Sequence, residues 1–130
     1  MRVISMRAAL AVLAATLLSC SSKSSSNNPT GPGGTAREFV SGDLAGSGAS
    51  FSHTFTKAGS FPYYCRYHGG AGGVGMSGVI TVTAPGSGYT PVTVPVSITT
   101  STLPSLAIKT GDTVKWTNNS GVLHTVESDT

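Results

Sequence analysis

Apolar and polar residues alternate along the second half of the chain, and this alternation predicts β-strands. Residues 92–98 place a valine or isoleucine at every second position, with threonine, proline or serine between them. Val114 and Trp116 alternate with Thr and Lys in the same way. Pro95 has no N–H for a strand ladder, so the first of these strands is predicted to lie at the edge of a sheet.

Several shorter apolar runs extend the same pattern through the rest of the chain. Phe51, His53 and Phe55 share one face of a strand, and His53 is interpreted as a packed sheet residue. Gly, Pro, Asn or Asp separates most of the runs, and no segment after residue 20 has a helical period. The sequence therefore predicts an all-β sandwich or barrel. The further runs cover residues 39–40, 61–65, 79–83, 106–108 and 123–126.

Two segments are predicted to connect strands. Residues 69–75 read Gly-Gly-Ala-Gly-Gly-Val-Gly, which predicts a loop that needs backbone freedom. No Lys-Ser/Thr pair and no helix follows them, so they do not form a phosphate loop. Residues 85–91 begin and end with proline and contain Gly-Ser-Gly, which predicts a linker between two groups of strands.

The first twenty residues have the pattern of an export signal. Arg2 and Arg7 precede an apolar run at residues 8–18, which is too short to span a bilayer. The run ends in Leu-Leu-Ser-Cys, which resembles the lipobox of bacterial lipoproteins and implies cleavage before Cys20 and lipidation of its sulfur. The protein is then expected outside the cytoplasm on a lipid anchor, and Ser21 favours an outer membrane where a cell has two. The alternative is an ordinary secretory signal that leaves Cys20 as a free thiol.

Composition divides the rest of the chain into a tether and one domain. Residues 21–36 are mostly Ser, Asn, Pro and Gly and predict a flexible tether, which leaves residues 37–130 as a small β-domain. The formal net charge of the whole chain is +3, and it falls to +1 when Arg2 and Arg7 leave with the signal. Charged residues are only 10% of the chain, which argues against a nucleic-acid partner.

Cys65 and three other residues form a candidate metal site. With Cys20 in lipid, Cys65 has no partner for a disulfide in a compartment that oxidises thiols. His68 follows three positions later and Met76 eight positions after that, while His124 is distant in sequence. One thiolate, two imidazoles and a thioether are the ligand set of a blue-copper site.

The residues around these ligands resemble a known family. Phe-Pro-Tyr-Tyr-Cys-Arg-Tyr-His at residues 61–68, followed by residues 75–82, is similar to the C-terminal ligand loop and last strand of plastocyanin-like cupredoxins. Residues 114–126 are similar to the stretch that carries the first histidine ligand of that family. The resemblance implies a cupredoxin-like Greek-key β-sandwich with one type 1 copper ion. It also implies that His124, Cys65 and His68 are the equatorial ligands and Met76 the axial one.

The order of these motifs is reversed relative to the family. In cupredoxins the first histidine precedes the Cys-x-x-His motif, whereas His124 lies 59 positions after Cys65. A circular permutation explains this order, with residues 37–84 as the family's C-terminal half, 85–91 as a new linker and 92–130 as the N-terminal half. Two alternatives remain: a fragment that joins the end of one domain to the start of the next, and a dimer that exchanges halves.

The resemblance implies an outer-sphere electron carrier rather than an enzyme, with His68 as the exit for the electron and brief encounters with redox proteins. Copper storage or delivery without redox turnover is the alternative that uses the same ligands. A thiol enzyme with Cys65 as nucleophile and His68 as base would need an orienting acid, and none is evident. A structural module without metal is the remaining possibility.

Overall fold

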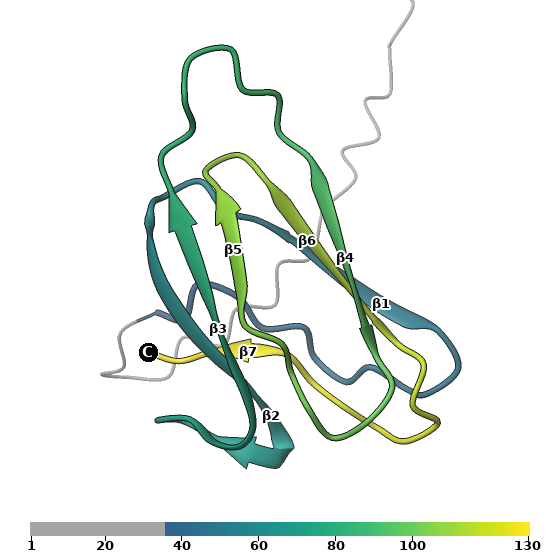
Figure 1. Cartoon of the computed structure of the whole chain (residues 1–130). Coiled ribbons are helices and arrows are strands. Elements are labelled where there is room, and N and C mark those ends of the chain that lie inside the picture. The colour runs from purple at the N-terminus through teal and green to yellow at the C-terminus, as the bar shows by residue number, and fades with distance from the viewer. Residues whose placement is uncertain (1–35) are drawn as a thin grey trace, which may run out of the picture.

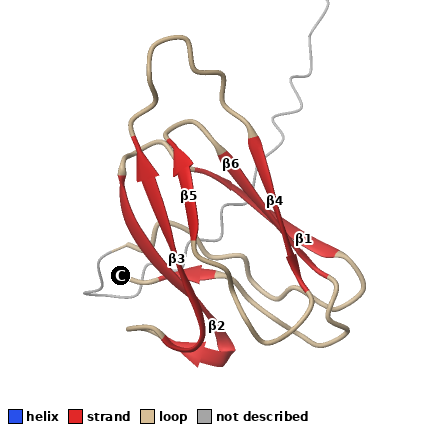
Figure 2. Cartoon of the chain, in the orientation of Figure 1, coloured by secondary structure: helices blue, strands red, loops and turns tan. Residues whose placement is uncertain are grey.

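The computed structural model describes residues 36–130, which form seven strands and no helix (Figures 1 and 2). The predicted signal peptide, Cys20 and nearly all of the predicted tether lie outside the described residues. Within residues 36–130 no helix has the length and apolar character needed to cross a membrane. The strands are β1 Ala49–Thr54, β2 Gly59–Gly70, β3 Val74–Thr83, β4 Thr93–Ile98, β5 Leu106–Lys109, β6 Thr113–Asn118 and β7 Glu127–Ser128.

The strands form two sheets, which confirms the prediction of an all-β sandwich. One sheet has the order β1-β6-β4 and the other has the order β5-β3-β2-β7. The pairs β3·β5 and β4·β6 are parallel, whereas β1·β6, β2·β3 and β2·β7 are antiparallel. In Figure 1 the two sheets lie face to face, and buried side chains from both sheets form one core cluster.

Alternation decides which side chains enter the core. Val114 and Trp116 of β6 are fully buried, and Lys115 between them is exposed. Val96 and Ile98 of β4 are buried in the same way, and β4 lies at the edge of its sheet, as Pro95 predicts.

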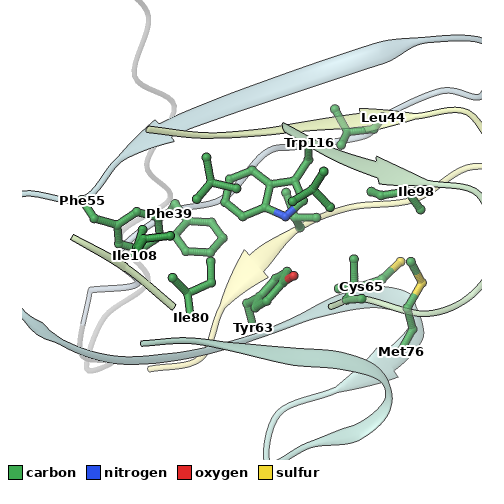
Figure 3. Close-up of a cluster of buried hydrophobic side chains, with 14 of the residues drawn as sticks. Phe39, Leu44, Phe55, Tyr63, Cys65, Met76, Ile80, Ile98, Ile108 and Trp116 are labelled. Carbon is green, nitrogen blue, oxygen red and sulfur yellow. The ribbon is translucent and has the colours of Figure 1, made fainter. Parts of the chain in front are cut away.

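Aromatic rings fill the centre of the core (Figure 3). Phe39 is stacked on Trp116 with ring centroids 5.2 Å apart, and it meets Phe55 edge to face at 5.8 Å. Tyr63 from the opposite sheet approaches Trp116 at 5.8 Å. These pairs join the two sheets through contacts that add to the burial of apolar area.

The beginning and end of the described chain pair with each other. We call residues 37–44 the N-terminal segment. It forms antiparallel bridges from Val40 to Glu127 and from Leu44 to His124. Ser128 N–H donates to the Phe39 carbonyl at 3.0 Å, and Ser41 N–H donates to the Val126 carbonyl at 3.0 Å.

One prediction about local structure is confirmed in part and one was wrong. Residues 69–75 need backbone freedom, because Gly72, Gly73 and Gly75 have positive φ, but β2 and β3 extend into the segment as a hairpin that pairs Gly69 with Gly75 and Gly70 with Val74. Residues 123–126 are not a strand, because among the described residues only His124 makes a bridge before β7 begins at Glu127. We call residues 69–75 the glycine hairpin.

The connection from β3 to β4 covers the predicted linker, and Asp112 fastens it to the domain. Asp112 is buried in the turn between β5 and β6. Its carboxylate accepts hydrogen bonds from the Tyr89 hydroxyl and from the N–H groups of Val92 and Lys109. The buried carboxylate thus joins the linker to the β5–β6 turn.

Candidate metal centre

Cys65 and His68 come from an irregular part of β2. The register between β2 and β3 shifts between Tyr64 and Gly69, so β2 carries extra residues at this point. Cys65 faces inward and is fully buried, whereas His68 is exposed. The irregularity therefore places a buried thiol and a solvent-facing imidazole within one short segment.

His124 reaches the same place from a different part of the chain. It lies between β6 and β7 and is fully buried. Both backbone polar groups of His124 are hydrogen-bonded to Leu44. The His124 N–H donates to the Leu44 carbonyl at 3.1 Å, and the Leu44 N–H donates to the His124 carbonyl at 2.8 Å. The N-terminal segment thus fixes the position of this histidine.

The three side chains converge. Cys65 Sγ lies 3.5 Å from His68 Nδ1 and 3.6 Å from His124 Nδ1, and the two imidazole centroids are 4.7 Å apart. All three ligand atoms lie within 4.8 Å of one another. A thiol has one proton and can donate it to only one nitrogen, whereas a cation can accept a lone pair from all three atoms. The donor set fits a bound metal ion of the kind that prefers thiolate and imidazole.

Backbone hydrogen bonds hold the sulfur against the His124 segment. The N–H of Thr125 donates to Cys65 Sγ at 3.3 Å. The N–H of Arg66 donates to Thr125 Oγ1 at 3.0 Å. Two adjacent residues of β2 are thereby connected to one residue beside His124.

The imidazole of His124 is kept in the form that binds metal. Burial, and after it the neighbouring imidazole of His68, lowers the pKa of His124 below its usual value. A neutral ring offers Nδ1 as a ligand. Its other nitrogen, Nε2, is buried and has no hydrogen-bond partner among the described residues.

Met76 lies at the same end of the core. Its side chain is 1% exposed, and Figure 3 draws Met76 and Cys65 at the same end of the buried cluster. The glycine hairpin delivers it, and two of its glycines are required by close contacts. A Cβ on Gly69 would lie 2.6 Å from the Met76 carbonyl oxygen, and a Cβ on Gly75, whose φ is +62°, would lie 2.5 Å from that of His68.

His53, the third histidine, takes no part in the cluster. Its ring packs edge to face against Phe55 at 4.8 Å, and Nε2 lies 3.2 Å from Glu38 Oε1. This agrees with the interpretation of His53 as a packed sheet residue.

Two residues next to the cluster, Thr125 and Glu127, were not predicted from the sequence. Thr125 follows His124 directly, and that adjacency was the available signal. Glu127 is 3% exposed and pairs with Arg37 and Arg66. Its partner Arg37 is distant in sequence, so nothing in the local pattern marks Glu127.

Comparison with known families agrees with the donor set. The model of the family described as copper binding proteins, plastocyanin/azurin family, matches residues 22–83, which include Cys65, His68 and Met76 but not His124. No curated protein and no solved structure matches the chain. The family match and the arrangement of Cys65, His68, His124 and Met76 fit a type 1 copper site. Together with the two-sheet fold, they support a cupredoxin.

Proposed function

We propose that this protein is a blue-copper electron carrier. The observation that carries the proposal is the convergence of Cys65 Sγ with Nδ1 of His68 and His124 inside a β-sandwich. Bound copper supplies one-electron exchange between Cu(I) and Cu(II). Proteins of the matched family are typically electron carriers rather than enzymes.

The residues around the site support this role by holding the ligands still. Cys65 and His124 are buried and backbone-bonded, so they can keep one geometry in both oxidation states. A fixed geometry lowers the rearrangement that accompanies a change of charge. His68 is exposed and gives the electron a short route to the surface.

The surface beside His68 suits brief protein contacts. Tyr67 is 47% exposed next to His68, and Val122 and Leu123 are 52% and 38% exposed immediately before His124. Val74 at the glycine hairpin is 63% exposed. Exposed apolar side chains of this kind mark interaction surfaces, and we propose transient redox proteins as the partners.

Visible spectroscopy tests the proposal. Addition of Cu(II) to the purified protein should produce an intense thiolate-to-copper band, and Cys65→Ser should abolish it. A colourless wild-type product, or a band that survives Cys65→Ser, would refute the proposed function. Reversible oxidation and reduction with a protein partner separates electron transfer from copper storage or delivery, in which the same ligands hold metal without turnover.

The proposed location is a membrane surface outside the cytoplasm, with Cys20 as the lipidated anchor. The pattern of residues 1–20 supports it. The mass of Cys20-containing peptides tests it: a lipid mass shift is expected, and an unmodified cysteine would refute the anchor.

The proposed chain order is a circularly permuted cupredoxin. The antiparallel pairing of the N-terminal segment with residues 124–128 supports it, because a connection between these two ends would restore the family's order. Light scattering on residues 21–130 tests it. A folded monomer is expected, whereas an obligate dimer would favour exchanged halves and contradict the proposal.

A further inference from the structure

Glu127, Arg37 and Arg66 form a charge cluster beside the part of β2 that carries Cys65, and only its carboxylate is buried. Glu127 is directly opposite Tyr64 in the β2·β7 register, and its side chain is 4% exposed. Arg37 binds the carboxylate through Nη1, and Arg66 Nη1 lies 3.4 Å from Glu127 Oε1. One carboxylate therefore faces two guanidinium groups.

The cluster is attached to both neighbours of Cys65. Arg66 follows Cys65 directly. Its Nη1 forms an ion pair with Glu127 Oε1 at 3.4 Å without a hydrogen bond, and its Nη2 donates to Asp43 Oδ1. Tyr64 precedes Cys65, and its hydroxyl accepts a hydrogen bond of 2.7 Å from Arg37 Nη2. Because Arg37 also binds Glu127, the residues on each side of the thiol are tied to a single carboxylate.

Glu127 also belongs to the segment that carries His124. It lies three positions after that histidine, and Thr125 between them bonds both Cys65 Sγ and the Arg66 N–H. The carboxylate thus connects the thiol-bearing strand to the imidazole-bearing segment. Residues that orient metal ligands from outside in this way typically change metal affinity by about 10- to 100-fold when they are replaced.

We propose that Glu127 is a positioning residue of the metal centre, which fixes the separation of Cys65 and His124 through Arg37 and Arg66. This inference depends on the proposed function, because it concerns the same site. Glu127 and Asp43 together offset the guanidinium charges of Arg37 and Arg66, so removal of the Glu127 charge leaves one surplus positive charge near the copper ligands.

Glu127→Gln tests the inference because it keeps the size of the side chain and removes the charge. We expect Cu(II) affinity, measured by competition with a chelator, to fall about 10- to 100-fold. The thiolate-to-copper band should shift, and the reduction potential should rise because surplus positive charge favours Cu(I). In the metal-free protein, the amide protons of Arg66 and Thr125 should exchange with solvent at least tenfold faster.

Glu38→Gln is the matched control. It removes a carboxylate whose hydrogen-bond partner is His53, which is not one of the proposed metal ligands. We expect it to leave Cu(II) affinity, the band and the exchange of both amides as in the wild type. Equal effects of the two substitutions would refute the inference, because they would show a general response to lost negative charge.

Arg66→Gln provides a second test if Glu127→Gln does not fold. It removes one of the two guanidinium partners, and its side chain is 43% exposed. Positioning predicts a lower Cu(II) affinity here as well, but a lower reduction potential, because a positive charge is lost. If the variants that fold keep wild-type Cu(II) affinity, band and amide exchange, the inference is overturned. The proposed function still stands in that case, as long as the wild-type protein shows the thiolate-to-copper band. Absence of that band in the wild type would refute the function itself.

Discussion

Replacement of Asp112 should strongly lower stability, because its carboxylate accepts hydrogen bonds from Tyr89, Val92 and Lys109. Asp112 is 2% exposed. Oδ1 accepts from Val92 N–H at 2.8 Å, Oδ2 accepts from Lys109 N–H at 2.8 Å, and the Tyr89 hydroxyl lies 2.7 and 2.9 Å from the two oxygens. In Asp112→Asn one of these oxygens becomes an NH₂ group that faces a donor.

The expected loss follows from these contacts. A hydrogen bond to a charged group contributes about 1.5–3 kcal/mol, and a buried N–H left without a partner costs about 1–3 kcal/mol. Asp112→Asn loses the charge and leaves one backbone N–H unpaired, so we expect the free energy of unfolding to fall by about 2–4 kcal/mol. For a domain of this size, such a loss lowers Tm by roughly 10–30 °C.

Thermal and urea unfolding, followed by circular dichroism, measure this loss. Tyr89→Phe is the matched variant, because it removes one hydroxyl from the same carboxylate and leaves both backbone contacts; we expect a smaller loss than for Asp112→Asn. If Asp112→Asn unfolds within about 0.5 kcal/mol of the wild type, a typical range for surface substitutions, the linker is not fastened as described.

The same carboxylate predicts an acid dependence. Burial raises the pKa of Asp112, but the hydrogen bonds from Val92, Lys109 and Tyr89 outweigh it and hold the pKa below its ordinary value. A carboxyl group with a lowered folded-state pKa stabilises the fold above its unfolded pKa of about 4, and this stabilisation is lost as the pH falls through the folded-state value. Asp112→Asn should therefore show a weaker loss of stability than the wild type below about pH 4.

Three further outcomes are expected. Gly69→Ala should lower the free energy of unfolding, measured in urea, by about 1–3 kcal/mol, because its Cβ would lie 2.6 Å from the Met76 carbonyl oxygen. Gly70→Ala, whose Cβ would have open space around it, should have little effect. Phe39→Ala should cost about 3–5 kcal/mol in the same assay, because it empties the centre of the aromatic core; a loss below 1 kcal/mol would contradict that packing. Burial raises the pKa of Tyr63 to about 12, so one of the four tyrosines should resist ionisation in an ultraviolet titration until near that pH. Stability should fall between about pH 10 and 12. Ionisation of all four tyrosines near pH 10 would contradict the burial of Tyr63.

Much of the fold was predictable from the sequence, because alternation reports directly on burial. Val114 and Trp116 enter the core as their period indicates, and Pro95 marks an edge strand. The convergence of Cys65 with His68 and His124 was expected from residue types and from the resemblance to cupredoxins. These features depend on local pattern or on a recognisable motif.

The remaining features depend on partners that are distant in sequence. The glycine hairpin has no apolar alternation, so composition suggested a loop, yet the strands on each side of it continue to pair. Residues 123–126 are apolar enough for a strand, but pairing with Leu44 at His124 is the only bridge before β7. Glu127 acquires its two guanidinium partners only through the fold.

The pairing of the N-terminal segment with residues 124–128 has a consequence for synthesis. A ribosome releases Cys65 and His68 long before His124, and the backbone of His124 then pairs with Leu44, which was made first. A growing chain therefore carries Cys65, His68 and Met76, three of the four proposed ligands, before His124 has emerged. The four ligands can therefore come together only after His124 has been made and has paired with Leu44, so a metal ion that arrives earlier would meet an incomplete site.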